Sequence, residues 1–267
     1  MADTKKLRSR IRSVNSTLHL THAMELVASS KIRRATLRME GSGDYAGAAA
    51  DAMDILARCP DCMESPYFAK RETDRTRLIV IAGDRGLAGG YNANIFRLMR
   101  SWPEAQVYPI GKRACDRYGG RFYSAEAFTS QDAASMAQWL CAEFRAGDYD
   151  RLGIVYTRYK SMMEQTAEVK WVLPLSLPED RRPADIVFEP NEEAILSAAV
   201  PGYVAGVLLA CVRESFASEV AARRAAMDAA GKNAREMIDE LMLEYNRARQ
   251  GAITQEITEI VAGAGGN

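Results

Sequence analysis

The sequence contains no apolar run long enough for a membrane span. A spanning helix needs about 18 consecutive apolar residues, and the longest such stretch, residues 204–212, is much shorter. Residues 1–5 carry charge with no apolar core behind it, which is not the pattern of a secretory signal. We therefore expect neither a membrane span nor a secretion signal.

Net charge is also absent, because 35 Lys and Arg residues balance 35 Asp and Glu residues. Nucleic-acid binding usually requires a basic surface, so the balance predicts no nucleic-acid partner. The charge is unevenly placed, however. Residues 1–40 hold nine basic and three acidic side chains, an excess of six positive charges. This excess favours contact between the N-terminal segment and an acidic partner surface.

Histidine and cysteine are too few for a convincing metal or redox site. His19 and His22 are the only histidines, and two ligands do not complete a metal site. Five cysteines indicate a reducing compartment rather than a disulfide framework. Cys59 and Cys62 have the spacing of a redox motif, but they follow a predicted helix, whereas reactive thiolates favour helix N-termini. A regulatory disulfide between them stays a minor alternative.

Catalytic groupings are missing as well. The chain has no Ser/His/Asp arrangement and no paired-carboxylate motif, so we expect no active site, cofactor or metal of its own.

Proline is absent from residues 202–262, and both ends of the chain show helical apolar spacing. A short helix over residues 192–199 should stop at Pro201, before a helix of roughly 90 Å that reaches about residue 262. Its predicted seam is Met227, Ala230, Ala234, Met237, Leu241, Tyr245, Ala248 and Ala252.

The N-terminal segment carries a matching stripe. Its apolar positions begin with a heptad spacing and then drift around the helix: Leu7, Ile11, Val14, Leu18, then Leu20, Met24, Val27, then Ile32, Ala35 and Met39. One helix leads into the middle of the chain and the other leads out of it. We therefore expect the two to pair antiparallel as a coiled coil.

The middle of the chain alternates between strand and helix patterns. Strands are predicted at residues 78–82, 107–110, 152–156 and 169–175, and helices at 92–101, 112–118 and 133–146. This alternation is typical of a mostly parallel sheet covered on both faces. Residues 178–190, rich in proline and acids, should form a loop.

A glycine-rich turn at residues 83–91 follows a predicted strand and precedes a helix, which is where phosphate loops occur. It lacks both the dinucleotide-binding pattern and the Gly-Lys-Ser/Thr ending of a P-loop. We prefer a tight packing turn here, with nucleotide binding as the alternative.

Three blocks carry the most specific signal: KLRSRIRSV with THAMELVASSKIRRA (6–14 and 21–35), DRGLAGGYNAN (84–94) and LEYNRARQGAITQEITEIVAGA (243–264). In this order they resemble the gamma subunit of F-type ATP synthases, and the tripeptide at 188–190 adds to the likeness. The resemblance implies an α/β fold class, with a long antiparallel coiled coil of the N- and C-terminal helices plus a central Rossmann-like α/β domain. The expected divisions are residues 1–58, 75–190 and 202–267.

The resemblance further implies a noncatalytic rotor shaft at the inner face of a bacterial plasma membrane. Its partners would be the alternating alpha and beta subunits of the catalytic ring, the epsilon subunit and the membrane ring of c subunits, driven by protons or sodium ions. The implied contact residues are Met24, Lys31, Arg33, Arg34, Tyr203, Asn246, Arg247, Arg249, Gln250, Thr254 and Glu256.

Four positions depart from the family's usual residues, namely His22, Ala88, Arg224 and Gly231. Two other classes of protein remain as alternatives. One is a nucleotide-binding α/β protein with helical arms, and the other is a static coiled-coil scaffold.

Overall fold

The computed structural model describes residues 2–59, 62, 64–69, 71, 75–176, 189 and 191–264. Its contacts divide the chain into two compact units. The helical unit comprises residues 1–28 and 224–267, and the α/β unit comprises residues 29–223. Two helices, α1 (Ala2–Leu56) and α6 (Glu192–Ala264), contribute residues to both units. The predicted loop at 178–190 and the tripeptide at 188–190 fall almost entirely outside the described residues.

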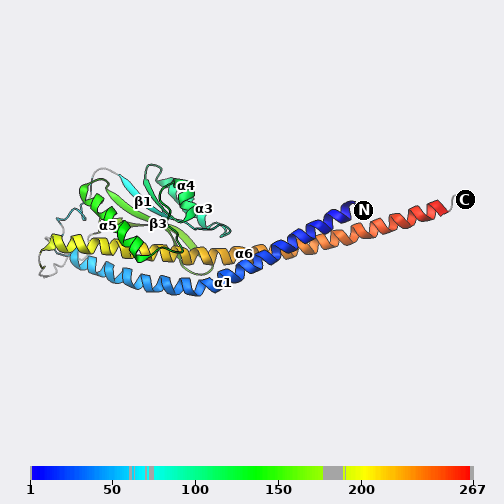
Figure 1. Cartoon of the computed structure of the whole chain (residues 1–267), viewed down its shortest axis with the longest axis horizontal. Coiled ribbons are helices and arrows are strands. Elements are labelled where there is room, and N and C mark those ends of the chain that lie inside the picture. Colours follow the sequence, from blue (N-terminus) through cyan, green and yellow to red (C-terminus); the bar gives the residue numbers. More distant parts are fainter. Residues whose placement is uncertain are drawn as a thin grey trace. The chain divides into compact units, whose positions relative to one another are not determined.

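In the helical unit, α1 and α6 contact each other through stripes that repeat every seven residues. On α1 the buried or half-buried positions are Thr4, Leu7, Ile11, Val14, Leu18, Thr21, Glu25 and Ala28, with Met24 beside them. On α6 the corresponding stripe is Arg224, Met227, Gly231, Ala234, Ile238, Leu241, Tyr245, Ala248 and Ala252. A seven-residue period keeps both stripes facing each other and is the signature of a left-handed coiled coil. The two segments lie side by side (Figure 1).

The predicted drift of the N-terminal stripe is wrong at Leu20 and Val27, whereas Met24, Ile32, Ala35 and Met39 are buried or half-buried as expected. Leu20 is 59% exposed and Val27 is 54% exposed, whereas Thr21 and Ala28 are buried. The heptad therefore continues without a break through Thr21 and Ala28. A search for large apolar residues does not count a threonine or an alanine. Met237 is likewise exposed, and Ile238 takes its place in the seam of α6.

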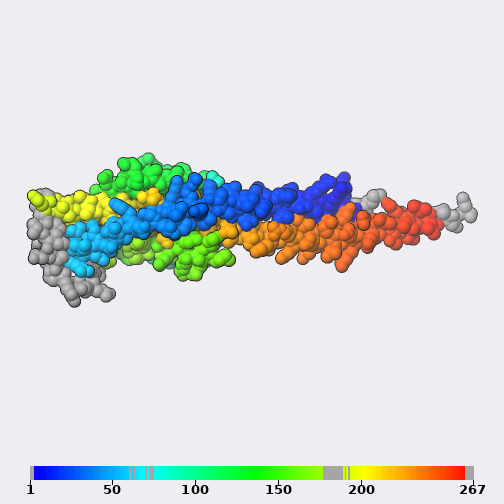
Figure 2. Space-filling view, turned by 90° about the horizontal axis from the view of Figure 1, so that it is seen from below, coloured from blue at the N-terminus to red at the C-terminus, as the bar shows by residue number. Residues whose placement is uncertain are grey.

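The red C-terminal end of α6 extends past the blue N-terminal end of α1 (Figure 2). Its side chains from residue 253 to residue 261 are all exposed. They include the apolar Ile253, Ile257, Ile260 and Val261, at the i, i+4, i+7 and i+8 positions of one helix face. The end of α6 therefore presents an unpaired apolar stripe.

In the α/β unit, four strands form a sheet of order β2-β1-β3-β4. They are β1 (Thr76–Ile81), β2 (Gln106–Ile110), β3 (Arg151–Tyr159) and β4 (Gln165–Leu173). Strand β1 runs parallel to β2 and β3, and β4 runs antiparallel to β3. The mostly parallel sheet that alternation predicted is thus confirmed, with the antiparallel strand at one edge.

Helices cover both faces of the sheet because alternate residues of β1 point to opposite sides. Ile79 and Ile81 join a core cluster with α1, α5 (Ser130–Ala146) and α6. Leu78 and Val80 join a second cluster with α3 (Tyr91–Leu98), η1 (Met99–Ser101) and α4 (Lys112–Tyr118). Within this unit α6 lies between the sheet and α1 (Figure 1).

Helix α5 begins earlier than predicted because of a capping box. Thr129 accepts from the backbone N–H of Asp132, and the Asp132 carboxylate accepts from the backbone N–H of Thr129. Reciprocal capping of this kind satisfies donors that the first turn of a helix leaves unpaired. It extends α5 back to Ser130 from the predicted start at residue 133.

The predicted helix stop at Pro201 is also wrong, since α6 continues through it. Proline in a helix interior removes one hydrogen bond and costs about 3 kcal/mol. Leu196, Val200 and Val204, on either side of the proline, are each at most 1% exposed and belong to the main core cluster. Burying such side chains stabilises by roughly 1.5–3 kcal/mol each, which outweighs the lost bond.

By length and composition, α6 is also the one described helix that contains a stretch apolar enough to cross a membrane. This differs from the sequence expectation. Val207, Leu208, Cys211 and Val212 from its apolar part are packed in the core cluster, and the buried core helix of a globular unit has the same composition.

We predict that Gly231→Ala stabilises the chain. Glycine costs about 1 kcal/mol relative to alanine inside a helix. A Cβ at position 231 would meet Thr21 Oγ1 at 3.6 Å and Leu18 Cδ1 at 3.9 Å, which are ordinary van der Waals distances. The free energy of unfolding, measured by urea denaturation, should therefore rise by about 0.5–1 kcal/mol. Gly251→Ala, outside the seam, is the matched control for propensity alone. A loss of stability confined to Gly231→Ala would contradict the described packing.

Candidate functional site

The glycine-rich turn after β1 lies against α6 in the α/β unit. A Cβ on Gly83 would come within 2.8 Å of the Glu219 carboxyl carbon, so a larger residue there would displace the Glu219 side chain. Tyr91 donates its hydroxyl to the carbonyl of Ser215 at 3.0 Å. Arg223 donates to the carbonyl of Gly86 at 3.2 Å. Gly83 therefore allows close packing of the turn on α6.

These contacts argue against the nucleotide-binding alternative. A phosphate loop offers free backbone N–H groups to an anion. Here the N–H of Gly83 donates to Asn92 Oδ1 at 2.9 Å, and the Glu219 carboxylate occupies the space beside the turn. A carboxylate in that position repels phosphate. The preferred prediction of a packing turn matches this geometry.

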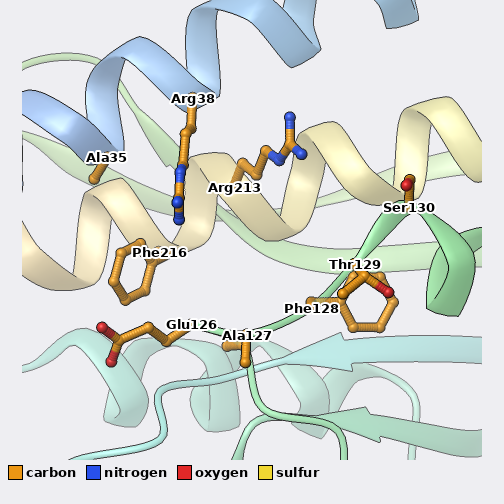
Figure 3. Close-up of a pocket in the computed structure, with 10 residues that line it drawn as sticks. Ala35, Arg38, Glu126, Ala127, Phe128, Thr129, Ser130, Arg213 and Phe216 are labelled. Carbon is orange, nitrogen blue, oxygen red and sulfur yellow. The ribbon is translucent and has the colours of Figure 1, made fainter.

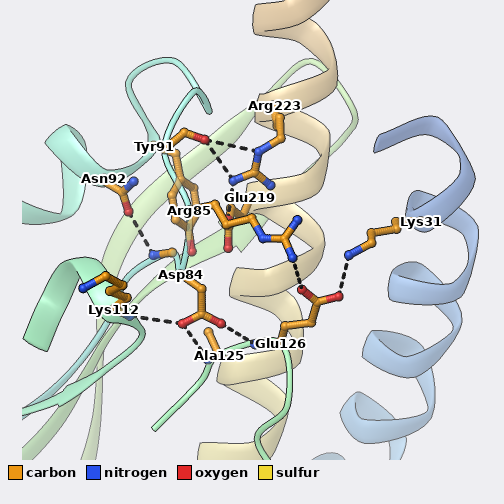
Figure 4. Close-up of polar contacts among 12 residues, drawn as sticks. Lys31, Asp84, Arg85, Tyr91, Asn92, Lys112, Ala125, Glu126, Glu219 and Arg223 are labelled. Atoms are coloured by element: carbon orange, nitrogen blue, oxygen red, sulfur yellow. Dashed lines mark hydrogen bonds and ion pairs between the residues drawn. The ribbon is translucent and has the colours of Figure 1, made fainter. Parts of the chain in front are cut away.

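Glu219 and Arg223 form a buried ion pair at the centre of this contact (Figure 4). Their side chains are 3% and 12% exposed, and the oxygen–nitrogen distance is 2.5 Å. Burial raises the pKa of Glu219, and the neighbouring Arg223 charge opposes this rise. Burial, followed by the Glu219 charge, raises the pKa of Tyr91. The buried side chains of Glu219, Arg223 and Tyr91 therefore hold the turn against α6.

Asp84 connects the same turn to the segment that leads into α5. Its carboxylate accepts from Ser124 Oγ at 2.6 Å and from the backbone N–H groups of Lys112, Ala125 and Glu126 at 3.1–3.2 Å. One carboxylate thus fixes the positions of α4 and of residues 124–126 relative to β1. Among the predicted motifs, DRGLAGG is an anchor between elements of the α/β unit.

Lys31, one of the predicted contact residues, has a partner within the chain. Its Nζ lies 2.5 Å from Glu126 Oε1, and Arg85 lies 4.0 Å from the other oxygen of the same carboxylate (Figure 4). Both Lys31 and Glu126 are a little over one-third exposed. Lys31 therefore links α1 to residues 124–126, which Asp84 holds in place. The exposed part of its side chain can still contact another molecule.

The other contact residues predicted on α1 differ in exposure. Arg33 and Arg34 are exposed, and neither forms an ion pair with a described carboxylate. Met24 is half-buried beside the seam of the helical unit. Tyr203 is half-buried in the α/β unit, where burial and then the charge of Asp54 raise its pKa.

The contact residues predicted on the last part of α6 are all exposed. They are Asn246, Arg247, Arg249, Gln250, Thr254 and Glu256. Thr254 Oγ1 donates to the carbonyl of Gln250 at 3.0 Å, and the remaining side chains have no inter-helical partner among the described residues. This surface and the apolar stripe from Ile253 to Val261 lie on the same unpaired segment.

No metal centre is formed in the part of the chain that the structure describes, where no three His, Cys, Asp or Glu residues gather closely enough to hold an ion. Cys59 and Cys62 are both buried and are not joined by a disulfide, and the two residues between them lie outside the described residues.

Sequence reasoning did not single out Glu219, Arg223 or Glu126. For the first two a signal was present, because an acid and a base four residues apart share one helix face. Whether such a pair is buried depends on what packs against that face. For Glu126 the sequence holds no signal, because its partner Lys31 is 95 residues away.

We predict that Glu219→Ala strongly destabilises the α/β unit, because it leaves Arg223 with an uncompensated, largely buried charge. Breaking a buried pair typically costs about 3–5 kcal/mol. The control is Asp228→Ala, which breaks an i,i+4 pair with Lys232 on the same helix. That pair is roughly half exposed, so its loss should change the stability far less than the loss of the buried pair does. Chemical denaturation measures both. Equal effects would show that the Glu219 pair is no more than a surface pair.

Comparison with known proteins gives consistent matches over the whole chain. A family model described as ATP synthase matches residues 3–266. An ATP synthase gamma chain from Ruminococcus albus is 39% identical over 279 residues, covering 97% of each chain. A sodium ion specific ATP synthase gamma chain from Acetobacterium woodii is 35% identical over 295 residues, covering 98% of each. The rotor of Euglena gracilis mitochondrial ATP synthase, 18% identical, has a TM-score of 0.69 over 94% of this chain and 99% of that one, a likeness of fold.

Proposed function

The chain belongs to the family of ATP synthase gamma chains, and we propose how its two units perform the work of that family. As a gamma chain it is the central-stalk rotor subunit, which couples rotation to ATP synthesis and hydrolysis and is not catalytic by itself. In this proposal residues 1–58 and 202–267 supply the shaft, and residues 75–190 supply the domain at its base.

The observation that carries the proposal is the uninterrupted seven-residue seam of the helical unit. A shaft that transmits torque must resist bending and slipping. Small residues in the seam, such as Ala28, Gly231 and Ala234, let two helix backbones approach closely. Heptad packing of both helices also fixes their register, because each side chain fits between four residues of the other helix.

The exposed surface of the last part of α6 supports contact with a surrounding ring of alpha and beta subunits. Arg247, Arg249 and Gln250 offer polar groups that can form and break hydrogen bonds with successive partners. The side chains of Ile253, Ile257 and Ile260 form no hydrogen bonds. They can therefore move along an apolar surface of the ring without breaking directional contacts.

The basic part of α1 supports contact with acidic segments of the ring. Arg33 and Arg34 are exposed, and Lys31 is partly occupied by Glu126. We propose Arg33 and Arg34 as the stronger ring contacts and Lys31 as a residue that exchanges between its internal carboxylate and the ring. Met24 and Tyr203 would act by packing, since both are half-buried.

The remaining partners follow from the family. The epsilon subunit and the c ring would bind the α/β unit, and the complex would lie at the cytoplasmic face of the plasma membrane. The coupling ion is either a proton or a sodium ion.

A cross-linking experiment separates a rotor from a static scaffold. We predict that a photoreactive label on Glu256→Cys, illuminated within the assembled complex, abolishes ATP turnover in the fraction that becomes linked to a ring subunit. The variant should carry Cys115→Ser, because Cys115 is the one described cysteine that is not buried. The same labelled complex kept dark is the control.

Turnover that persists in the cross-linked fraction would contradict rotation. ATP hydrolysis by the purified chain alone would contradict its noncatalytic role.

A further inference from the structure

A cleft in the α/β unit lies between α1, α6 and the segment leading into α5. Its volume is about 430 Å³, and its wall includes Arg38 from α1 and Arg213 and Phe216 from α6 (Figure 3). A second hollow of about 280 Å³ continues from it and shares Arg38 and Phe216 with it. Neither the glycine-rich turn nor the exposed end of α6 takes part in this cleft.

The cleft has an excess of positive charge. Four cationic side chains line the two hollows, namely Lys31, Arg34, Arg38 and Arg213. The one acidic residue that lines them, Glu126, is already paired with Lys31 and lies 4.0 Å from Arg85. The three arginines therefore face the cleft with no carboxylate partner among the described residues.

The Ser42 side chain links Arg213 of α6 to the backbone of α1 at Arg38. The buried Ser42 hydroxyl donates to the carbonyl of Arg38 at 2.7 Å and accepts from the Arg213 guanidinium. Burial, followed by the positive charge of Arg38, lowers the pKa of Arg213. A guanidinium has five N–H donors, and the described contacts of Arg213 use one nitrogen. The site thus places like charges together and leaves most of their donors available.

The other polar groups on the wall of the cleft also suit an anion. Ser130 contributes a hydroxyl group, which can donate to an oxyanion, whereas the Thr129 hydroxyl already donates to Asp132 Oδ2 at 2.6 Å. Asp132 already caps the first turn of α5, so the positive character of the site comes from the arginines and not from the helix end. Phosphate matches paired guanidinium groups through several short, charge-assisted hydrogen bonds.

We propose that this cleft binds a phosphate-bearing anion, held between Arg38 of α1 and Arg213 of α6 with Ser130 as a further donor. The bound anion would neutralise the repulsion between the arginines. It would also connect the two helices to the segment that enters α5, and so stabilise the α/β unit. This site goes beyond the rotor function and does not depend on it.

Titration calorimetry on the full chain tests the proposal, with inorganic phosphate, pyrophosphate, ATP and adenosine as separate ligands at constant ionic strength. Constant ionic strength removes the general screening effect of salt. We expect saturable binding of one equivalent of phosphate or pyrophosphate, and a rise in melting temperature that chloride does not give. If pyrophosphate and ATP bind equally well, the site recognises the phosphate groups alone. If ATP binds more tightly, the ligand is a nucleotide. Adenosine, which has no phosphate, should not bind.

Three variants make the test specific. Arg213→Gln and Arg38→Gln should each weaken binding about tenfold or more, since each removes a charge-assisted contact. Arg33→Gln removes the same charge from an exposed position outside the cleft and should bind as the parent chain does. Ser42→Ala removes the hydrogen bond to Arg213 but keeps both guanidinium groups. It therefore shows whether a variant loses binding because the local structure is disturbed or because a guanidinium is missing.

The proposal is overturned if no ligand binds saturably, if Arg33→Gln weakens binding as much as Arg213→Gln, or if binding survives the loss of both arginines. Melting curves without ligand identify any variant that fails to fold. In that case Arg213→Lys, which keeps the charge but loses the planar donors, should still bind more weakly than Ser42→Ala.

Discussion

The structure depends on the pairing of two helical stripes that repeat every seven residues. In the helical unit the pairing combines larger apolar side chains, such as Leu18 and Leu241, with small ones, including Ala28, Gly231 and Ala234. The larger side chains supply buried apolar area and the small ones allow close backbone approach, so the stability of this unit is spread over many successive contacts. The same arrangement gives the property that a shaft needs, because slipping by one residue would expose the whole stripe at once.

The heptad period also continues along α1 in the α/β unit, at Ile32, Ala35, Met39, Ser42, Ala46, Ala49, Met53 and Leu56. In this unit α6 also packs against the sheet, since Val200, Val204 and Leu208 belong to the main core cluster. Hydrogen bonds hold this part of α6 to the sheet as well. The Ser215 hydroxyl accepts from the backbone N–H of Thr157, and the Ser218 hydroxyl donates to the carbonyl of Thr157. These bonds join the helix to β3 directly.

Local chemistry made much of the fold predictable from sequence. The helix at residues 112–118 was predicted with its observed bounds, because glycines stand on both sides of it. Apolar runs identified all four strands. Pro201 and Leu20 were misjudged for a shared reason: burial by distant neighbours decides whether a proline interrupts a helix and which residue enters a seam. Local propensity does not contain that information.

The polar contacts were predictable only in part. The exposed residues on α6 were found through resemblance to a family, and their exposure is compatible with partner contact. The pairing of Lys31 with Glu126 and the hydrogen bond from Arg213 to Ser42 join residues that lie far apart in sequence. A single sequence without aligned relatives offers no means of finding such pairs.

The central claim is that this chain turns while its ring subunits hydrolyse ATP. Its most direct test is a bead attached through a cysteine introduced at the exposed Arg121 of the α/β unit, with the catalytic ring fixed to a surface. We predict rotation in one direction that requires ATP and stops when ATP is removed. A bead that stays still while the same complexes hydrolyse ATP would contradict the account.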